Sequence, residues 1–301
     1  MKATRLHAFG DVDQFQCEDV PDLVAGAGQV LVKVEASSFN TVELYARQGY
    51  LAQMFQMDLP AILGIDIAGT VVAVGAGVSG FTAGARVIGK LPVDGKGAQA
   101  ELALATPAQL ANLPDSVSFS AGATLPLAGL TGRQGVDALA VQPGERVLVT
   151  GALGAVGRVA VQYTKELGGI PVGAVRAERI AEAKALTGEA LIIGAGGERS
   201  FDKAIDTAGG PVAAAAIALL RYGGTLAAVA GIPEGSNADG RITIANIMGT
   251  ENAAQLQQIA DAAGRGDLVI PVAKTLSLSD VPEAHRLVAA GQVGGKIVFV
   301  H

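Results

Sequence analysis

Short apolar segments recur through the first third of the chain. Val, Ile and Ala alternate with polar residues or run continuously at 30–37, 67–75 and 85–89, and turns rich in Gly, Pro and Asp separate these segments. This pattern is typical of strands joined by tight turns. We therefore expect residues 1–117 to form a compact β-rich unit.

From about Ser118, apolar strands alternate with Ala- and Leu-rich helical segments. Two strands and two helices follow one another directly, at 145–151, 156–168, 170–176 and 178–188. This βαβ order predicts a parallel sheet. Four further strands would complete a doubly wound sheet of five or six strands, and we expect them at 190–195, 203–209, 225–231 and 241–247.

The pattern changes again near Gly266. A helix is expected just before it, and an extended segment, a second helix and a last strand after it, at 253–266, 270–278, 281–292 and 296–301. The parallel-sheet region is therefore expected to span 118–265.

Composition and charge exclude several classes of protein. The chain has 22 Lys and Arg against 28 Asp and Glu, a net charge of −6 with no basic stretch, so a nucleic-acid partner is not expected. One Cys and three His supply neither an internal disulfide nor a Cys/His zinc cluster. No apolar run approaches the length of a membrane span, and the N-terminal residues lack the apolar core of a signal peptide. A cytoplasmic, metal-free protein with no membrane partner is the expectation.

A glycine-rich turn follows the strand that ends at Thr150. It places Gly151, Gly154 and Gly157 where the strand gives way to a helix, as a dinucleotide pyrophosphate requires. The spacing departs from G-x-G-x-x-G, because Ala152 takes the first Gly position. Ordinary turn chemistry in a chain with 41 Gly is the alternative interpretation.

Two arginines follow the next strand, where NAD-specific proteins carry an acidic residue for the ribose 2′-hydroxyl. Arg176 ends the strand and Arg179 lies three residues on. Guanidinium groups bind a 2′-phosphate with paired donors, so NADPH is the expected cofactor. Alternatively, both are solvated charges at a helix start, and Glu178 leaves room for NADH.

With these residues in view, the chain resembles the zinc-free quinone oxidoreductases, the zeta-crystallin-like branch of the medium-chain dehydrogenase/reductase superfamily. The resemblance spans nearly the whole length and rests on NTVELYARQG, PAILGIDIAGTVVAVGAGVSGFTAGARVIG, ATLPLAGLT, VQPGERVLVTGALGAVG, IDTAGG and GGKIVFV. It implies an α/β fold, with a GroES-like β-rich catalytic domain from 1–117 and 266–301. A Rossmann domain at 118–265, with its doubly wound parallel sheet, would bind NADP.

The resemblance also implies site residues. Asn40 begins the segment that lines the nicotinamide pocket in the family, with Tyr45 and Arg47 at its aromatic and basic positions, and a phenol can donate to a substrate oxygen as charge develops. Alternatively, Asn40 ends a strand, Tyr45 packs in the core and Arg47 pairs with Glu43 along a helix. The expected cofactor-binding residues are Thr131, Gly151, Ala152, Gly154, Ala155, Val156, Gly157, Arg176, Arg179, Asp206 and Gly231.

Other positions depart from the family pattern or carry weaker signals. Gly132 and Arg133 replace the usual Ala and aromatic residue after Thr131, and Gln99 and Leu102 replace aromatic residues. Asp206 is expected to cap a turn or bond near the cofactor ribose rather than act as a base. Structural roles are expected for three further residues, with Cys17 as a small buried apolar group: Cys17, His285 and Lys296.

The expected activity is hydride transfer from NADPH to a quinone or an α,β-unsaturated carbonyl without zinc. A noncatalytic NADPH-binding protein and an enoyl-thioester reductase are the alternatives. The only basic candidates for an acyl-carrier entrance are Arg47, Arg133 and Lys90. The segment 241–247 reads as an exposed edge strand, and the resemblance implies that it pairs with its copy in a homodimer.

Overall fold

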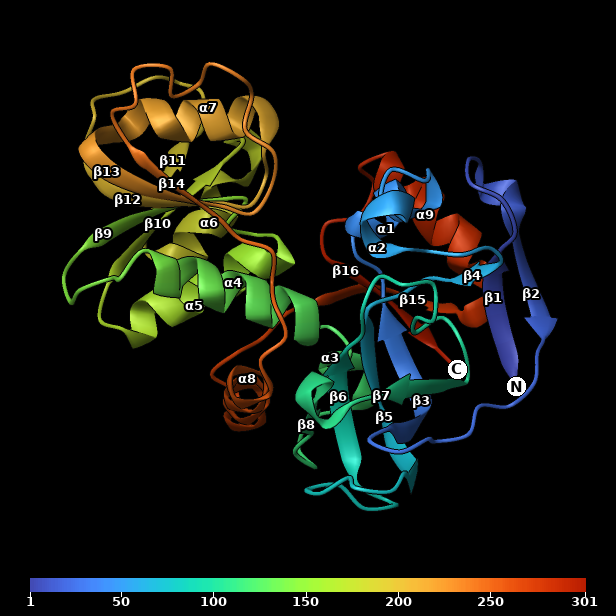
Figure 1. The fold of residues 1–301 in the computed structure, drawn as a ribbon. Helices are drawn as coiled ribbons and strands as arrows, with labels where there is room; N and C mark the ends of the chain where they lie inside the picture. The colour runs from blue at the N-terminus through green and yellow to red at the C-terminus, as the bar shows by residue number, and fades with distance from the viewer. The chain divides into compact units, whose positions relative to one another are not determined.

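The computed structural model describes all 301 residues and divides them into two compact units. Unit 1 contains Met1–Leu127 and Glu251–His301, and unit 2 contains Ala128–Thr250. Both chain termini therefore lie in unit 1, as Figure 1 shows. No helix combines the length and the apolar character that crossing a membrane requires.

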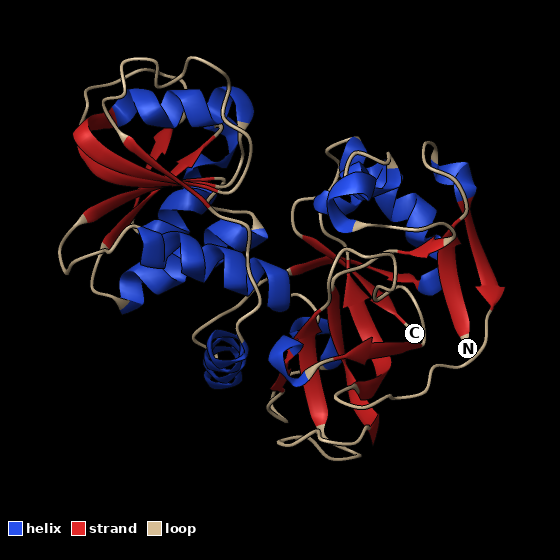
Figure 2. Ribbon diagram, in the orientation of Figure 1, coloured by secondary structure: helices blue, strands red, loops and turns tan.

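Unit 1 is built mainly of antiparallel strands, drawn red in Figure 2. A three-stranded sheet has the order β2-β1-β4, with bounds Phe15–Asp19, Lys2–Leu6 and Ala61–Ile62. A seven-stranded sheet has the order β15-β16-β3-β5-β6-β8, and β7 pairs with β3 beside it. Its strands are β3 (Val30–Ser38), β5 (Asp66–Val74), β6 (Arg86–Lys90), β7 (Leu102–Ala105), β8 (Leu110–Asn112), β15 (Val272–Ser277) and β16 (Lys296–Val300).

Short helices complete unit 1. They are α1 (Val42–Arg47), α2 (Ala52–Phe55), α3 (Phe119–Gly122), α8 (Ala253–Arg265) and α9 (Val281–Ala289), with 3₁₀ turns η1 (Val12–Gln14), η2 (Pro107–Gln109) and η4 (Leu278–Asp280). One core cluster lies among α1, α9, β1 and β16, and includes Leu6, Phe39, Val281 and Phe299. A second packs the strands of the large sheet together.

Unit 2 holds one parallel sheet of six strands in the order β11-β10-β9-β12-β13-β14. Their bounds are β9 (Arg146–Thr150), β10 (Ile170–Val175), β11 (Glu189–Ile192), β12 (Phe201–Asp206), β13 (Leu220–Ala228) and β14 (Thr243–Asn246). The chain runs from β9 to β11 toward one edge and from β12 to β14 toward the other, so the strand order reverses between the neighbouring strands β9 and β12. Ligands of such sheets bind beyond the carboxyl ends of the strands at this point.

Helices cover both faces of this sheet, which explains its continuous apolar strands. Val147 and Val149 of β9 pack into one core cluster with α4 (Pro126–Ala138), α5 (Ala155–Glu166) and α6 (Ile180–Thr187). Leu148, pointing the other way, packs with Ile217 of α7 (Gly210–Leu219). Figure 1 shows α7 on one side of the sheet and α4 and α5 on the other. The 3₁₀ turn η3 (Ala177–Arg179) precedes α6.

The α/β architecture expected from the sequence is confirmed, while two details differ. The units divide at residues 127 and 250 instead of 117 and 265, and α8 joins unit 1, where Gln257 bonds the backbone of Asn112 in both directions. Cys17 is exposed, so its expected burial is wrong. It lies on β2, an edge strand whose middle residues face solvent.

Candidate active site

The glycine turn connects β9 to α5 as its spacing predicts. Gly151 has φ +59°, and Gly154 caps α5 in an extended conformation. The first bond of the α5 helix runs from the backbone N–H of Arg158 to the Gly154 carbonyl. The backbone N–H groups of Ala155, Val156 and Gly157 precede this bond, so they are available to an anion. A Cβ on Gly157 would lie 2.2 Å from the Gly151 carbonyl oxygen, so this position requires Gly. The turn therefore has the close packing and the free donors that a pyrophosphate needs.

Ala152 is accommodated at the first position of the fingerprint. It is fully buried, and its Cβ would lie 3.4 Å from a Cβ built on Gly173 of β10. This distance is an ordinary van der Waals contact, so the turn holds Ala at the first fingerprint position without crowding.

Asp206 supports the turn from the end of β12. Thr150 donates its hydroxyl to Asp206 Oδ1, and the Gly209 N–H donates to Oδ2 at 2.9 Å. Thr207 adds two bonds to Thr150, through its N–H and its hydroxyl. Asp206 is fully buried, so it joins the ends of β9 and β12 as a turn-capping residue, one of the two roles expected for it.

Two expected cofactor residues, Thr131 and Gly231, lie elsewhere in unit 2. Thr131 is buried in α4, and the following Gly132 lets α4 approach α5, since a Cβ there would lie 2.7 Å from that of Val159. The Arg133 guanidinium stacks on Tyr163 at 4.6 Å. Gly231 follows β13, its carbonyl accepts from Gly210, and the space around its Cα is open.

Both arginines after β10 are on the surface. Arg176 has a side chain that is 79% exposed and lies 3.3 Å from the Glu178 carboxylate. Arg179 is more covered and bonds Glu182. Exposed ion pairs of this kind are weak, so Arg176 can leave Glu178 for a stronger anion.

A buried polar cluster in unit 1 surrounds the Lys296 ammonium group. Lys296 Nζ donates to Asp66 Oδ2 at 3.0 Å, to Asn40 Oδ1 at 2.6 Å and to Ser38 Oγ at 2.8 Å, and also contacts the Phe39 carbonyl. Asn40 Nδ2 in turn donates to Asp66 Oδ2 at 2.9 Å. The cluster brings together β3, β5 and β16, which are far apart in the sequence. It gives the Asn40 amide partners on both its oxygen and its nitrogen.

Glu43 lies beside this cluster without a cation bonded to it. Its Oε1 accepts the Asn40 N–H at 2.9 Å, and its Oε2 accepts from Gln99 Nε2 at 2.5 Å. Burial is the main reason that the pKa of Glu43 rises to about 8. The helical pairing of Glu43 with Arg47, which was the alternative interpretation, is absent, because the Arg47 guanidinium donates to the Gly10 carbonyl.

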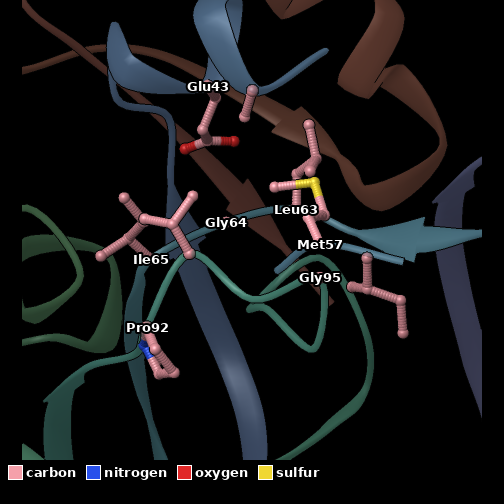
Figure 3. Close-up of a pocket in the computed structure, with 10 residues that line it drawn as sticks. Glu43, Met57, Leu63, Gly64, Ile65, Pro92 and Gly95 are labelled. Carbon is pink, nitrogen blue, oxygen red and sulfur yellow. The ribbon is translucent and has the colours of Figure 1, made fainter. Parts of the chain in front are cut away.

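Glu43 also lines a small pocket in unit 1, drawn in Figure 3, which has room for about one water molecule. The other walls are almost entirely apolar side chains and backbone, contributed by Ala46, Met57, Ile62, Leu63, Gly64, Ile65, Pro92, Val93 and Gly95.

The other two residues expected to be catalytic take different positions on α1. Tyr45 is 51% exposed. Arg47 is buried, donates to the Gly10 carbonyl and lies near His285. Arg47 therefore holds the N-terminal loop and does not join the Asn40 cluster.

The sequence did not predict that Glu43, Asp66 and Gln99 lie in one hydrogen-bonded network with Asn40. Their signals were faint: an Asn and a Glu three residues apart, and a polar residue in place of an aromatic one. No group of three or more His, Cys, Asp or Glu residues is arranged to hold a metal ion.

Comparison with known proteins agrees with this architecture. A family model described as an alcohol dehydrogenase GroES-like domain matches residues 26–115, and one described as a zinc-binding dehydrogenase matches residues 173–299. A chloroplast envelope quinone oxidoreductase homolog of Arabidopsis thaliana is 36% identical over 48% of this chain and 46% of its own length. A 2-methylene-furan-3-one reductase of Solanum lycopersicum is 34% identical over 56% of this chain and 45% of its own. The chain thus spans about half the length of these curated relatives.

The solved structure of the quinone oxidoreductase from Coxiella burnetii aligns with the whole chain and with 99% of its own, at a TM-score of 0.89 and 27% identity. The chain therefore belongs to the medium-chain dehydrogenase/reductase superfamily, in its quinone oxidoreductase branch.

Proposed function

We propose that this protein is an NADPH-dependent oxidoreductase that reduces a quinone or an α,β-unsaturated carbonyl compound without a metal ion. The observation that carries the proposal is the turn between β9 and α5, with its free N–H groups and with Arg176 after the next strand. The names of the relatives, a quinone oxidoreductase homolog and a furanone reductase, support the acceptor class.

The cofactor would be held by unit 2. The N–H groups of Ala155, Val156 and Gly157 would bind the pyrophosphate, and Arg176, assisted by Arg179, would bind the 2′-phosphate. Thr131 and Gly231 are proposed to contact the cofactor, while Asp206 keeps the turn in shape. When bound, the nicotinamide would supply the hydride.

The acceptor would use unit 1. Tyr45 has a half-exposed phenol and is proposed to donate a hydrogen bond to the acceptor oxygen. Asn40 is proposed to lie beside the nicotinamide, with its amide fixed by Lys296 and Asp66.

The test is NADPH consumption measured by absorbance with a panel of quinones and enones, before and after exhaustive chelation. Turnover that survives chelation, with NADPH preferred to NADH, is the expected result. NADPH binding without consumption across the panel would identify a noncatalytic binding protein instead. Stoichiometric zinc in active protein, or loss of activity on chelation, would contradict the metal-free mechanism.

An enoyl-thioester reductase receives little support from the basic residues. Arg47 is buried against Gly10, and Arg133 stacks on Tyr163, which leaves only Lys90 of the three candidates for an acyl carrier. Including one enoyl thioester in the panel tests this alternative directly.

A further inference from the structure

The Glu182 carboxylate, in the first turn of α6, lies between two guanidinium groups. Its Oε1 accepts from Arg158 Nη2 at 3.0 Å, and its Oε2 accepts from Arg179 Nε at 2.8 Å and from Arg179 Nη2 at 2.5 Å. Charge-assisted bonds to guanidinium groups are the contacts that bind carboxylates and phosphates. The space between Arg158 and Arg179 is therefore an anion position, and the protein's own carboxylate occupies it.

The two arginines come from the two turns that form a dinucleotide site. Arg158 directly follows the last glycine of the turn between β9 and α5, and its Nε donates to the Leu153 carbonyl within that turn at 3.1 Å. Arg179 ends the 3₁₀ turn η3, just after β10, the strand that pairs with β9. In sheets of this kind the pyrophosphate lies at the glycine turn and the adenosine ribose at the end of the next strand. The Glu182 bridge thus connects the pyrophosphate turn to the ribose end of the site.

The charges of this cluster leave room for an anion. Three guanidinium groups, of Arg158, Arg176 and Arg179, face two carboxylates, of Glu178 and Glu182. The Nη1 groups of Arg158 and Arg179 take no part in the bonds to Glu182, so each arginine keeps further donors.

Glu182 is the member of the bridge that is free to move. Its side chain is 45% exposed, whereas that of Arg158 is only 18% exposed and is fixed by the Leu153 carbonyl. Rotation of Glu182 into solvent leaves no buried charge without a partner, because water solvates the carboxylate. The two arginines would then present their donors to another anion.

We propose that Arg158 and Arg179 bind the 2′-phosphate of NADPH in place of the Glu182 carboxylate, and that Glu182 weakens NADPH binding by competing for them; this inference rests on the proposed function. Arg158 is then a specificity-determining residue from the glycine-turn helix, in addition to the arginines after β10. NADH carries an uncharged 2′-hydroxyl at this position, which does not displace a carboxylate from two guanidinium groups. Glu182 therefore lowers the preference for NADPH without affecting NADH.

Binding of cofactors and their fragments tests the competition without turnover. The ligands are NADPH, NADH, adenosine 2′,5′-bisphosphate and adenosine 5′-monophosphate, each titrated by calorimetry into the parent protein and Glu182→Gln. The variant should bind NADPH and the bisphosphate about three- to tenfold more tightly, because two partly exposed ion pairs no longer compete with the phosphate. Its affinity for NADH and the monophosphate should equal that of the parent. The gain should shrink as salt is added, since salt screens these charges.

Glu189→Gln is the matched control. Glu189 forms a similarly exposed ion pair with Arg146, but at the amino ends of the strands, away from the glycine turn. Removing this carboxylate changes the net charge of unit 2 by the same amount. Glu189→Gln should leave the affinities for all four ligands unchanged.

Arg158→Met tests the new phosphate ligand. It should weaken NADPH and the bisphosphate about ten- to hundredfold, as expected for lost hydrogen bonds to a charged group. Because Arg158 also bonds the Leu153 carbonyl of the glycine turn, the ratio of NADPH to NADH affinity is the readout. Arg179→Met, in a surface turn, should lower the same ratio and serves if Arg158→Met does not fold.

The outcomes separate this inference from the proposed function. Unchanged or weaker NADPH binding by Glu182→Gln, or equally tighter binding of NADPH and NADH, would overturn the competition while NADPH binding by the parent still supports the proposed function. A parent protein that binds neither NADPH nor the bisphosphate would reject the NADPH-dependent function, and this inference with it.

Discussion

At the residue scale, Arg176 tests cofactor choice. Its guanidinium is exposed and only weakly paired with Glu178. Arg176→Ala should weaken NADPH binding by about 1.5–3 kcal/mol, the contribution of hydrogen bonds to a charged group, and leave NADH binding almost unchanged. Calorimetric titration of both cofactors measures the difference.

Glu178 supplies the control. Because Glu178 competes with the phosphate for Arg176, Glu178→Gln should strengthen NADPH binding modestly and leave NADH binding alone. An equal loss of both cofactors in Arg176→Ala would remove this residue from the 2′-phosphate site.

His285 makes a separate prediction about acid stability. Both ring nitrogens are buried without partners between Phe15 and Phe39, and burial, with Arg47 nearby, lowers the pKa of His285 to about 3. Between about pH 6.5 and pH 3, His285 is therefore protonated in the unfolded chain but neutral in the folded chain. The free energy of unfolding falls as the pH drops below about 6.5. In His285→Leu this loss disappears, so its free energy of unfolding should exceed that of the parent by about 2–3 kcal/mol more at pH 4.5 than at pH 7.

Urea unfolding at the two pH values measures this effect. His301 is also buried with a lowered pKa, of about 4, but it is present in both proteins and cancels in the comparison. If the free energy of unfolding of the parent and of His285→Leu changed equally between the two pH values, the pKa of His285 would be the same in the folded and unfolded chains.

At the element scale, the sequence predicted the strands of the parallel sheet well, but it did not predict which distant strands of unit 1 lie side by side. The strands β9 to β14 and the Gly turn follow from local periodicity and spacing. Strand β13 begins at Leu220 instead of 225, because Arg221–Gly224 interrupts the apolar pattern at its start. The cluster of Asn40, Asp66 and Lys296 depends on which distant strands pair, and a single sequence carries no such signal. The same limit applies to the Gln99–Glu43 pair.

Gly157 tests the packing of α5 on the turn. In Gly157→Ala the new Cβ would lie 2.2 Å from the Gly151 oxygen and 2.8 Å from the Ala152 Cα, both backbone atoms that cannot move independently. We expect a destabilisation of about 1–3 kcal/mol and an equal loss of NADPH and NADH binding, since the pyrophosphate site is shared. Thermal unfolding and cofactor titration are the measurements.

Gly294 is a matched position for this substitution. A Cβ there meets nothing within 4 Å, so Gly294→Ala should leave stability and cofactor binding unchanged. If Gly157→Ala behaved like Gly294→Ala, the close approach of α5 to the turn would not be required.

At the scale of the whole molecule, the division into units could be expected only approximately. The change from β-rich to βαβ patterning locates unit 2, but an amphipathic helix does not reveal which sheet it will cover. Helix α8 follows the parallel sheet in sequence and yet bonds Asn112 and Ser116 of unit 1. The boundary predicted at 265 is therefore displaced to 250.

The edge of the parallel sheet predicts how two chains associate. Strand β14 pairs with β13 on one side only, and its four residues, Thr-Ile-Ala-Asn, include no charge or Pro to protect the other side. We expect a symmetric homodimer in which β14 pairs with its copy, as the resemblance to the family implies. Light scattering at micromolar concentration with NADPH present should then give twice the chain mass of 30.1 kDa.

A charge variant tests that interface. In an antiparallel pairing of β14 with itself, Thr243 of one chain lies near Asn246 of the other, and both are exposed in the single chain. Thr243→Lys with Asn246→Lys would place like charges opposite each other and should give a monomer that still binds NADPH. The same two-lysine change at the exposed positions Ser79 and Thr82 should leave the dimer intact. A monomeric parent protein, or a dimer unaffected by the β14 lysines, would show that this edge stays unpaired.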